Sequence, residues 1–176
     1  MKINIYSIVK PSNDDFDKLI KEFIKMSSKY AKVEIFYIFN KDIAKAQTIG
    51  ENESKKIYTK SYLPYLKGYN IALDVLGKSV DSFAFSKLLE DKNEVNFFIG
   101  GAFGFENEFL SLCDSVISLS NLTFAHKIAT LILSEQIFRS LSIIFYSFSK
   151  LKEQYPSYGN LYETLKEKLN NEYDFY

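Results

Sequence analysis

The chain is poor in several features that would otherwise decide its class. A single cysteine, Cys113, excludes an internal disulfide. The N-terminal stretch MKINIYSIVK has too short an apolar run for a signal peptide, and no uninterrupted run of about 20 apolar residues suits a membrane span. The most apolar segment, 127–148, is broken by charged and amide side chains, which favours a buried helix. We expect a cytoplasmic protein without a membrane segment.

Charge of either sign is not in excess. The 22 basic residues balance 22 acidic ones, so any nucleic acid must be recognised through a local patch rather than an overall field. All basic residues except Arg139 are lysines, which leaves one side chain able to form a planar, bidentate donor fork. His126 is the only histidine. We expect no metal centre.

Apolar residues are abundant, at 47 % of 176 residues. A chain of this length can bury one complete core but hardly two. We expect one domain over residues 1–150 and an appended segment over 151–176. That segment is charged, thinly apolar, and interrupted by Pro156 and Gly159.

Short β-branched and aromatic runs alternate with helical patterns along the domain. The strands are nearly continuous in apolar residues, which is typical of parallel strands covered on both faces. The pattern predicts an α/β layered fold with a parallel sheet. Strands are expected at 3–9, 33–39, 69–75, 95–100 and 115–120, and helices at 14–29, at 55–62, from 81 or 82 onward and near 106–113.

A long helix is expected over 124–148. Its apolar residues occupy more than one face, so the helix must be buried on two sides, either inside the domain or against a second subunit. We favour the second arrangement and expect a homodimer. The residues concerned are Ile128, Leu131, Ile132, Ile137, Phe138, Leu141, Ile144 and Phe145.

The stretch VNFFIGGAFGFENEF, residues 95–109, passes from a strand through several glycines toward a helix. Glycine lets the main chain approach a ligand, but a tight turn packed on a helix would need glycines equally. The dinucleotide fingerprint G-x-G-x-x-G is incomplete because position 99 is isoleucine, and it would follow the fourth strand instead of the first. A phosphate-binding G-x-x-x-x-G-K-[ST] loop is absent.

Two other segments, like the glycine loop, lie at the carboxyl ends of expected strands. The third expected strand ends in ALD at 72–74, and the fifth continues into SLSNLTF at 118–124, which is rich in hydroxyl groups. Ligands of open parallel sheets bind beyond the carboxyl ends of the strands. We therefore expect both segments and IGGAFG, at 99–104, to converge on one pocket.

In these segments the sequence resembles the RlmH-type members of the SPOUT methyltransferases. The family's strand end IGG...G, its loop LS-(S/A)-(L/M)-T-(L/F)-P-H and its helix motif E-x-x-Y-R-A correspond to IGGAFG, LSNLTFAH and EQIFRS. The resemblance implies an α/β fold with a C-terminal trefoil knot and S-adenosyl-L-methionine as cofactor. It implies methyl transfer to the N3 position of a pseudouridine in the 23S rRNA of the assembled ribosome, in a homodimer whose second subunit completes the pocket.

The resemblance also implies which residues surround the methyl donor. An adenine ring needs main-chain hydrogen bonds and apolar walls, which a loop of this composition can supply. For Leu122 and Phe124 the alternative is ordinary core packing. Position 125 is alanine where the family has proline, which makes the loop less rigid. The implied donor-binding residues are Leu73, Gly101, Ser120, Asn121, Leu122, Thr123, Phe124 and Ala125.

Two side chains are candidates for catalysis. Arg139 lies four residues after Glu135, the spacing of a helical ion pair, but its likeness to the family's helix arginine implies contact with an RNA phosphate or the substrate base. His126 lies near the start of the long helix, where the dipole disfavours its charged form, and is either structural or the proton acceptor. Cys113 is expected in the core, without a nucleophilic pairing to His126.

The chain departs from the family at its end, where SFSK at 147–150 replaces the family's HPYH. Either later residues substitute, with Lys150, Tyr155 and Tyr158 as candidates, or the chain binds the donor or the ribosome without catalysis. A reading-frame change near the end would give the same pattern. An unrelated α/β hydrolase has little support because no G-x-S-x-G elbow follows a strand.

Overall fold

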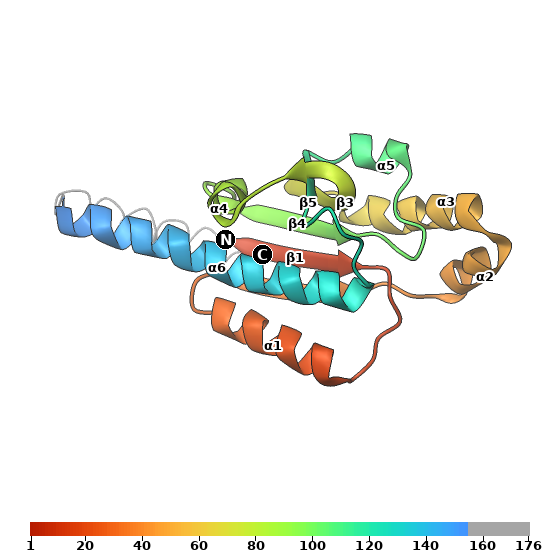
Figure 1. Ribbon diagram of the computed structural model, residues 1–176, viewed down its shortest axis with the longest axis horizontal. Helices are drawn as coiled ribbons and strands as arrows, with labels where there is room; N and C mark the ends of the chain where they lie inside the picture. The colour runs from red at the N-terminus through yellow and green to blue at the C-terminus, as the bar shows by residue number, and fades with distance from the viewer. Residues whose placement is uncertain (155–176) are drawn as a thin grey trace, which may run out of the picture.

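Five parallel strands form one sheet in the computed structural model, which describes residues 1–154 (Figure 1). The strand order is β2-β1-β4-β3-β5, so β4 lies at the centre. The parallel sheet expected from the sequence is confirmed. The strands are β1 (Lys2–Ser7), β2 (Lys32–Tyr37), β3 (Tyr69–Ser79), β4 (Glu94–Ile99) and β5 (Ser115–Ser118).

Helices cover both faces of the sheet and create two hydrophobic cores. The first core contains Ile3 and Ile5 of β1 together with Leu133 of the long helix, and the second contains Tyr6 of β1 and Tyr58. Side chains of one strand thus alternate between the cores, which explains the continuous apolar runs. The first face carries α1 (Asp15–Ser27), α4 (Ser82–Leu89) and α6 (His126–Gln154), and the second carries α2 (Lys41–Ile49), α3 (Glu51–Tyr62), the 3-10 turn η1 (Leu63–Tyr65) and α5 (Asn107–Ser111).

A row of buried amides crosses the sheet on the second face. Asn4 of β1 donates to Asn96 of β4 over 2.8 Å, and Asn96 donates to Asn70 of β3 over 3.3 Å. Asn70 in turn donates through its main chain to Asp114 over 2.7 Å. A one-residue slip of β4 would turn Asn96 into the opposite apolar core without these partners, so the amides help to fix the register.

One helical region was not predicted from the sequence, and several predicted helix and strand boundaries differ from the observed ones. The segment 41–54, interpreted as polar and without a helix, forms α2 and the first turn of α3. Helix α1 begins at Asp15 and is capped by Asp14, through a capping box with Asp17. Strand β3 continues to Ser79, and α6 to Gln154, both beyond the expected ends. The appended segment expected at 151–176 lies largely outside the described residues.

Helix α6 is the longest helix of the described chain. Over His126–Ser147 it is long and apolar enough to cross a membrane, a test that core helices of soluble proteins also pass. It runs along α1 and α4 on the first face of the sheet and extends past the strands (Figure 1). Only 33 % of its most apolar window is buried, so much of this window is not covered by the other elements of residues 1–154.

We predict that Phe97→Ala destabilises the fold strongly. Phe97 is fully buried in β4 and stacks on Phe85 of α4, with ring centroids 5.6 Å apart. Removing such a ring leaves a cavity and should lower the free energy of unfolding by about 3–5 kcal/mol, measured by urea denaturation. The control is Phe39→Ala at an exposed position, where the change should stay within about 0.5 kcal/mol. Equal losses in the two variants would contradict this placement of the core.

Candidate functional site

Three strand ends line one open cavity at the carboxyl edge of the sheet. They are residues 73–75 of β3, where its ladder to β4 ends, the end of β4 with its following loop at 99–105, and the end of β5 with its following loop at 118–124. The start of α6 closes the fourth side, and the cavity volume is about 260 Å³. The convergence expected from the sequence is therefore present in the structure. The residues expected around the donor that line the cavity are Leu73, Gly101, Ser120, Leu122, Thr123 and Phe124.

The glycine loop after β4 is a tight turn. The Gly104 N–H donates to the Gly101 carbonyl over 2.9 Å, and Gly104 has a φ of +74°, which favours glycine. A Cβ on Gly101 would lie 2.5 Å from the ring of Tyr58, on α3. Packing from behind the loop therefore requires glycine at this position, whatever occupies the cavity in front.

Two tyrosines of α3 support that loop. Tyr62 is fully buried and donates its hydroxyl hydrogen to the Ile99 carbonyl over 2.5 Å. Tyr58, also fully buried, accepts a hydrogen bond from the Gln47 amide over 2.8 Å. These two supports were not predicted from the sequence. The available signal was the four-residue spacing of Ser54, Tyr58 and Tyr62, the buried residues of a helix that is otherwise polar.

The hydroxyl groups of the loop after β5 shape the loop itself. Ser118 donates to the Ser120 carbonyl over 2.7 Å, and the Ser120 hydroxyl accepts from the Leu122 N–H over 3.0 Å. The Leu122 side chain is 69 % exposed, so ordinary core packing does not explain it. Phe124 is half-buried in the cavity wall. Asn121 and Ala125 belong to the same loop without lining the cavity.

Strand β3 makes an excursion beside the cavity. Ile117 of β5 pairs with Leu73 and again with Lys78, so residues 74–77 bulge out of the ladder. Asp74 accepts the Leu76 N–H over 2.9 Å at the tip of the bulge. A Cβ on Gly77 would lie 2.6 Å from the Ile117 backbone, and glycine therefore permits β3 to close tightly on β5.

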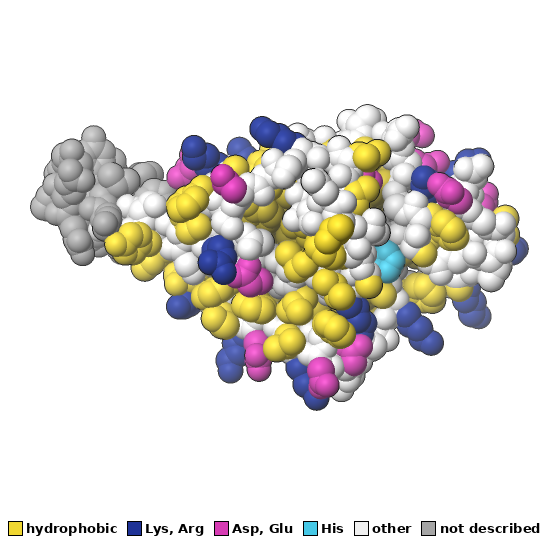
Figure 2. Space-filling model, viewed as in Figure 1, with side chains coloured by type: hydrophobic (Ala, Val, Ile, Leu, Met, Phe, Trp, Pro, Cys, Tyr) yellow, Lys and Arg dark blue, Asp and Glu magenta, His cyan; other side chains and the backbone are white. Residues whose placement is uncertain are grey.

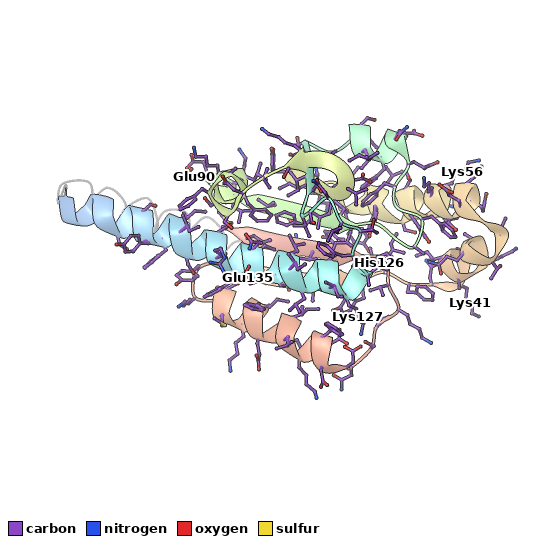
Figure 3. The ribbon with its side chains drawn as sticks, in the orientation of Figure 1. Lys41, Lys56, Glu90, His126, Lys127 and Glu135 are labelled. Atoms are coloured by element: carbon purple, nitrogen blue, oxygen red, sulfur yellow. The ribbon has the colours of Figure 1, made fainter. Side chains whose placement is uncertain are left out.

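His126 is the first residue of α6 and lines the cavity. Figure 3 shows it on the side of α6 that faces the strand ends. Burial lowers the pKa of His126 below its ordinary value of 6.5, and a hydrogen bond with the Gly100 backbone opposes part of this shift. The imidazole is therefore mostly neutral near pH 7 and able to accept a proton.

Arg139 and Cys113, the other two side chains considered for a chemical role, do not line the cavity. Arg139 is exposed and forms an ion pair with Glu135 one turn before it. It stands 13 residues beyond His126, which is about 20 Å along a helix. Cys113 is half-buried, and burial raises the pKa of its thiol to about 12, so it stays protonated and unreactive. Within residues 1–154, no group of three or more His, Cys, Asp or Glu side chains could hold a metal ion.

The fold and the cavity together define a class: a parallel-sheet α/β protein whose binding region is built from loops at the carboxyl edge of the sheet. A family model described as a predicted SPOUT methyltransferase matches residues 1–147. The chain belongs to this SPOUT methyltransferase family.

Named relatives agree with the family match. The chain is 73 % identical over 143 residues to the ribosomal RNA large subunit methyltransferase H of Aliarcobacter butzleri, covering 81 % of this chain and 95 % of that protein. Its identity to the protein of the same name from a Sulfurovum species is 48 %, with the same coverage. A solved structure of the SpoU methyltransferase AviRb from Streptomyces viridochromogenes, in complex with AdoMet, matches with a TM-score of 0.43 and 12 % identity, over 83 % of this chain and 61 % of that one.

We predict that Gly101→Ala destabilises the protein through Tyr58. The added Cβ meets the tyrosine ring, and such overpacking should cost about 1–3 kcal/mol of unfolding free energy. In a Tyr58→Leu background, which lacks the ring atoms concerned, the same substitution should cost much less. Urea denaturation of all four proteins measures the difference. An equal cost in both backgrounds would show that Tyr58 does not impose glycine.

We predict that His126 makes stability depend on pH. Its pKa is lower in the folded protein than in the unfolded chain, so the stability is complete above about pH 6.5 and falls as the pH drops toward the folded value. His126→Gln should flatten the curve of unfolding free energy between pH 7.5 and 5.5, measured by urea denaturation. The chain has no other histidine to obscure the comparison. A variant with the wild-type slope would contradict the prediction.

Proposed function

We propose that the protein transfers a methyl group from S-adenosyl-L-methionine to 23S rRNA on the assembled ribosome, at the N3 position of a pseudouridine. The observation that carries the proposal is the convergence of three loops on one cavity in a chain of the SPOUT methyltransferase family. The Aliarcobacter relative, whose name describes methylation of large-subunit ribosomal RNA, matches over the part of the chain that builds this cavity.

The cavity walls suit the donor's nucleoside. Leu73 and Phe124 line the cavity with apolar surface, and Leu122, which also lines it, is 69 % exposed. Loop main chain at Gly101 and between Ser120 and Ala125 supplies donors and acceptors for an adenine ring. When bound, the donor supplies an electrophilic methyl group on a sulfonium ion, so the protein needs chiefly to hold and align.

The acceptor nitrogen must lose a proton, and the cavity offers two ionisable side chains, Asp74 and His126. Asp74 already accepts a hydrogen bond from the Leu76 N–H. His126 is held largely neutral by burial, which is the form a general base requires. We assign His126 as the proton acceptor.

We propose a homodimer for the active form. Phe16 and Leu19 of α1, Phe83 of α4, and Phe145 of α6 all expose substantial apolar surface. Figure 2 shows hydrophobic side chains gathered over α1 and α6 on the face toward the viewer. A second protomer would remove this surface from water. Arg139, about 20 Å along α6 from its own cavity, would then serve the partner's cavity by contacting RNA.

A trefoil knot is also part of the proposal. Support comes from the excursion of β3, which pairs with β5 on both sides of residues 74–77 and wraps closely at Gly77. The chain that leaves β5 then turns through 119–125 into α6, beside this excursion. We further propose a cytoplasmic enzyme, with residues 1–150 as the methyltransferase domain and 151–176 as an appendage.

A second candidate function is donor or ribosome binding without catalysis. It is favoured by the point at which the family match ends, residue 147, where SFSK replaces the family's HPYH. Lys150, Tyr155 and Tyr158 remain proposed substitutes. Tyr155 and Tyr158 lie outside the described residues, and the side chain of Lys150 is likewise not described.

The experiment is methyl transfer from tritium-labelled S-adenosyl-L-methionine to ribosomes that lack the modification. The proposal expects label in 23S rRNA, mapped by mass spectrometry to a pseudouridine. Donor binding by calorimetry without label in the RNA would favour the second candidate. Absence of both would overturn the assignment of the cavity.

We predict that Arg139→Met separates catalysis from donor binding. Since Arg139 does not line the cavity of its own protomer, the donor Kd should stay within about twofold of wild type, while loss of a contact to RNA should lower kcat/KM by roughly 100-fold. Lys87→Met, which removes an exposed cation from α4, should leave both unchanged. Unaltered transfer by the Arg139 variant would refute its proposed role.

A further inference from the structure

A buried carboxylate joins the start of α1 to the start of α6. The Asp17 side chain is only 3 % exposed, yet it accepts hydrogen bonds from the Ser12 hydroxyl at 2.6 Å, the Asp14 N–H at 3.2 Å and the Tyr37 hydroxyl at 3.1 Å. The Lys127 ammonium adds an ion pair at 3.2 Å and also contacts Asp14. The charge is therefore buried with a full set of donors.

Both charges persist throughout the physiological pH range. Burial would raise the pKa of the Asp17 carboxyl, but the hydrogen bonds from Ser12, Asp14, Lys127 and Tyr37 outweigh it and hold the pKa far below its usual range. The hydrogen bond to Asp14 raises the pKa of Lys127. The link between α1 and α6 is thus permanent rather than a switch.

Lys127 follows His126 directly. Figure 3 shows the two side chains leaving the first turn of α6 in different directions, with Lys127 on the side toward α1. The helix begins after Ala125, whose carbonyl accepts the Ala129 N–H over 3.0 Å, but alanine has no side chain with which to cap a helix. Ile128, in the same turn, is 38 % exposed. Apart from Lys127, the first turn of α6 is held by the hydrogen bond between His126 and the Gly100 backbone and by the packing of Ala129 against the first core.

We propose that Lys127, paired with Asp17, is a positioning residue for the cavity. The pair anchors the first turn of α6 and thereby sets His126 and the loop at 118–125 against the glycine turn at 100–104. Lys127 itself does not line the cavity. The identity of the ligand rests on the proposed function, whereas the anchoring of the turn does not.

The test compares Lys127→Met, Lys127→Arg and Asp14→Asn with wild type. Asparagine caps a helix about as well as aspartate, so Asp14→Asn removes a charge from Lys127 and keeps the cap of α1. The control is Lys18→Met, which breaks the 2.8 Å ion pair to Asp15 on the same helix. Two quantities are measured: hydrogen exchange of the amides at 119–130, and the Kd of S-adenosyl-L-methionine by calorimetry.

Lys127→Met should accelerate exchange at 119–130 roughly tenfold while exchange in β4 stays unchanged, and should weaken donor binding by a similar factor. Lys127→Arg should restore both quantities, and Asp14→Asn should fall between. The control should match wild type. Uniformly faster exchange across the sheet would mean a purely structural role and would overturn the proposal, as would unchanged exchange or an unchanged donor Kd. If wild type binds no donor, the proposed function fails, and the exchange data alone decide whether the turn is anchored.

Discussion

The structure depends on the burial of β4 on both faces. Val95, Phe97 and Ile99 fill one core while Asn96 and Phe98 face the other, so this strand has no solvent-facing side. Its neighbours must then be parallel strands covered by helices, and their carboxyl ends must meet at one edge. The cavity is a consequence of that constraint, because the loops that follow β4 and β5 meet there with residues 73–75 of β3, where its ladder to β4 ends.

Much of this arrangement is predictable from local sequence. The strands were predicted from short runs of β-branched and aromatic residues, and each run coincides with an observed strand. The parallel arrangement follows because apolar residues fill consecutive positions, as in FFI at 97–99, and not alternate ones. Once the sheet is parallel, the convergence of 72–74, 99–104 and 118–124 needs no further information. The loops of the cavity were thus predicted, while the assignment of a methyl donor depended on family resemblance.

Contacts between segments that are distant in the chain could not be predicted from the sequence, because the residues involved carry no local signal of the contact. Gly101 looks like a ligand-binding glycine, but the ring of Tyr58, over 40 residues earlier, already excludes a Cβ there. Lys127 and Asp17 each resemble exposed helical charges until the fold brings the two helix starts together. Helix α2 was missed because its buried residues, Ile43 and Ala46, are too few to give a periodic pattern.

The glycine turn at 100–104 has the tyrosines of α3 on one side and the cavity on the other. Tyr58 and Tyr62 press on it from behind, and Tyr62 fixes the Ile99 carbonyl at the end of β4. A turn held so firmly cannot adjust to a ligand, so any adjustment must come from the opposite wall, the loop at 118–125. That loop has alanine at position 125, where the resemblance implies a proline, and it leads into a helix whose preceding residue has no side chain able to cap it. The proposed link from Lys127 to Asp17 acts on this second wall, so that both walls of the cavity are held in place before a ligand binds.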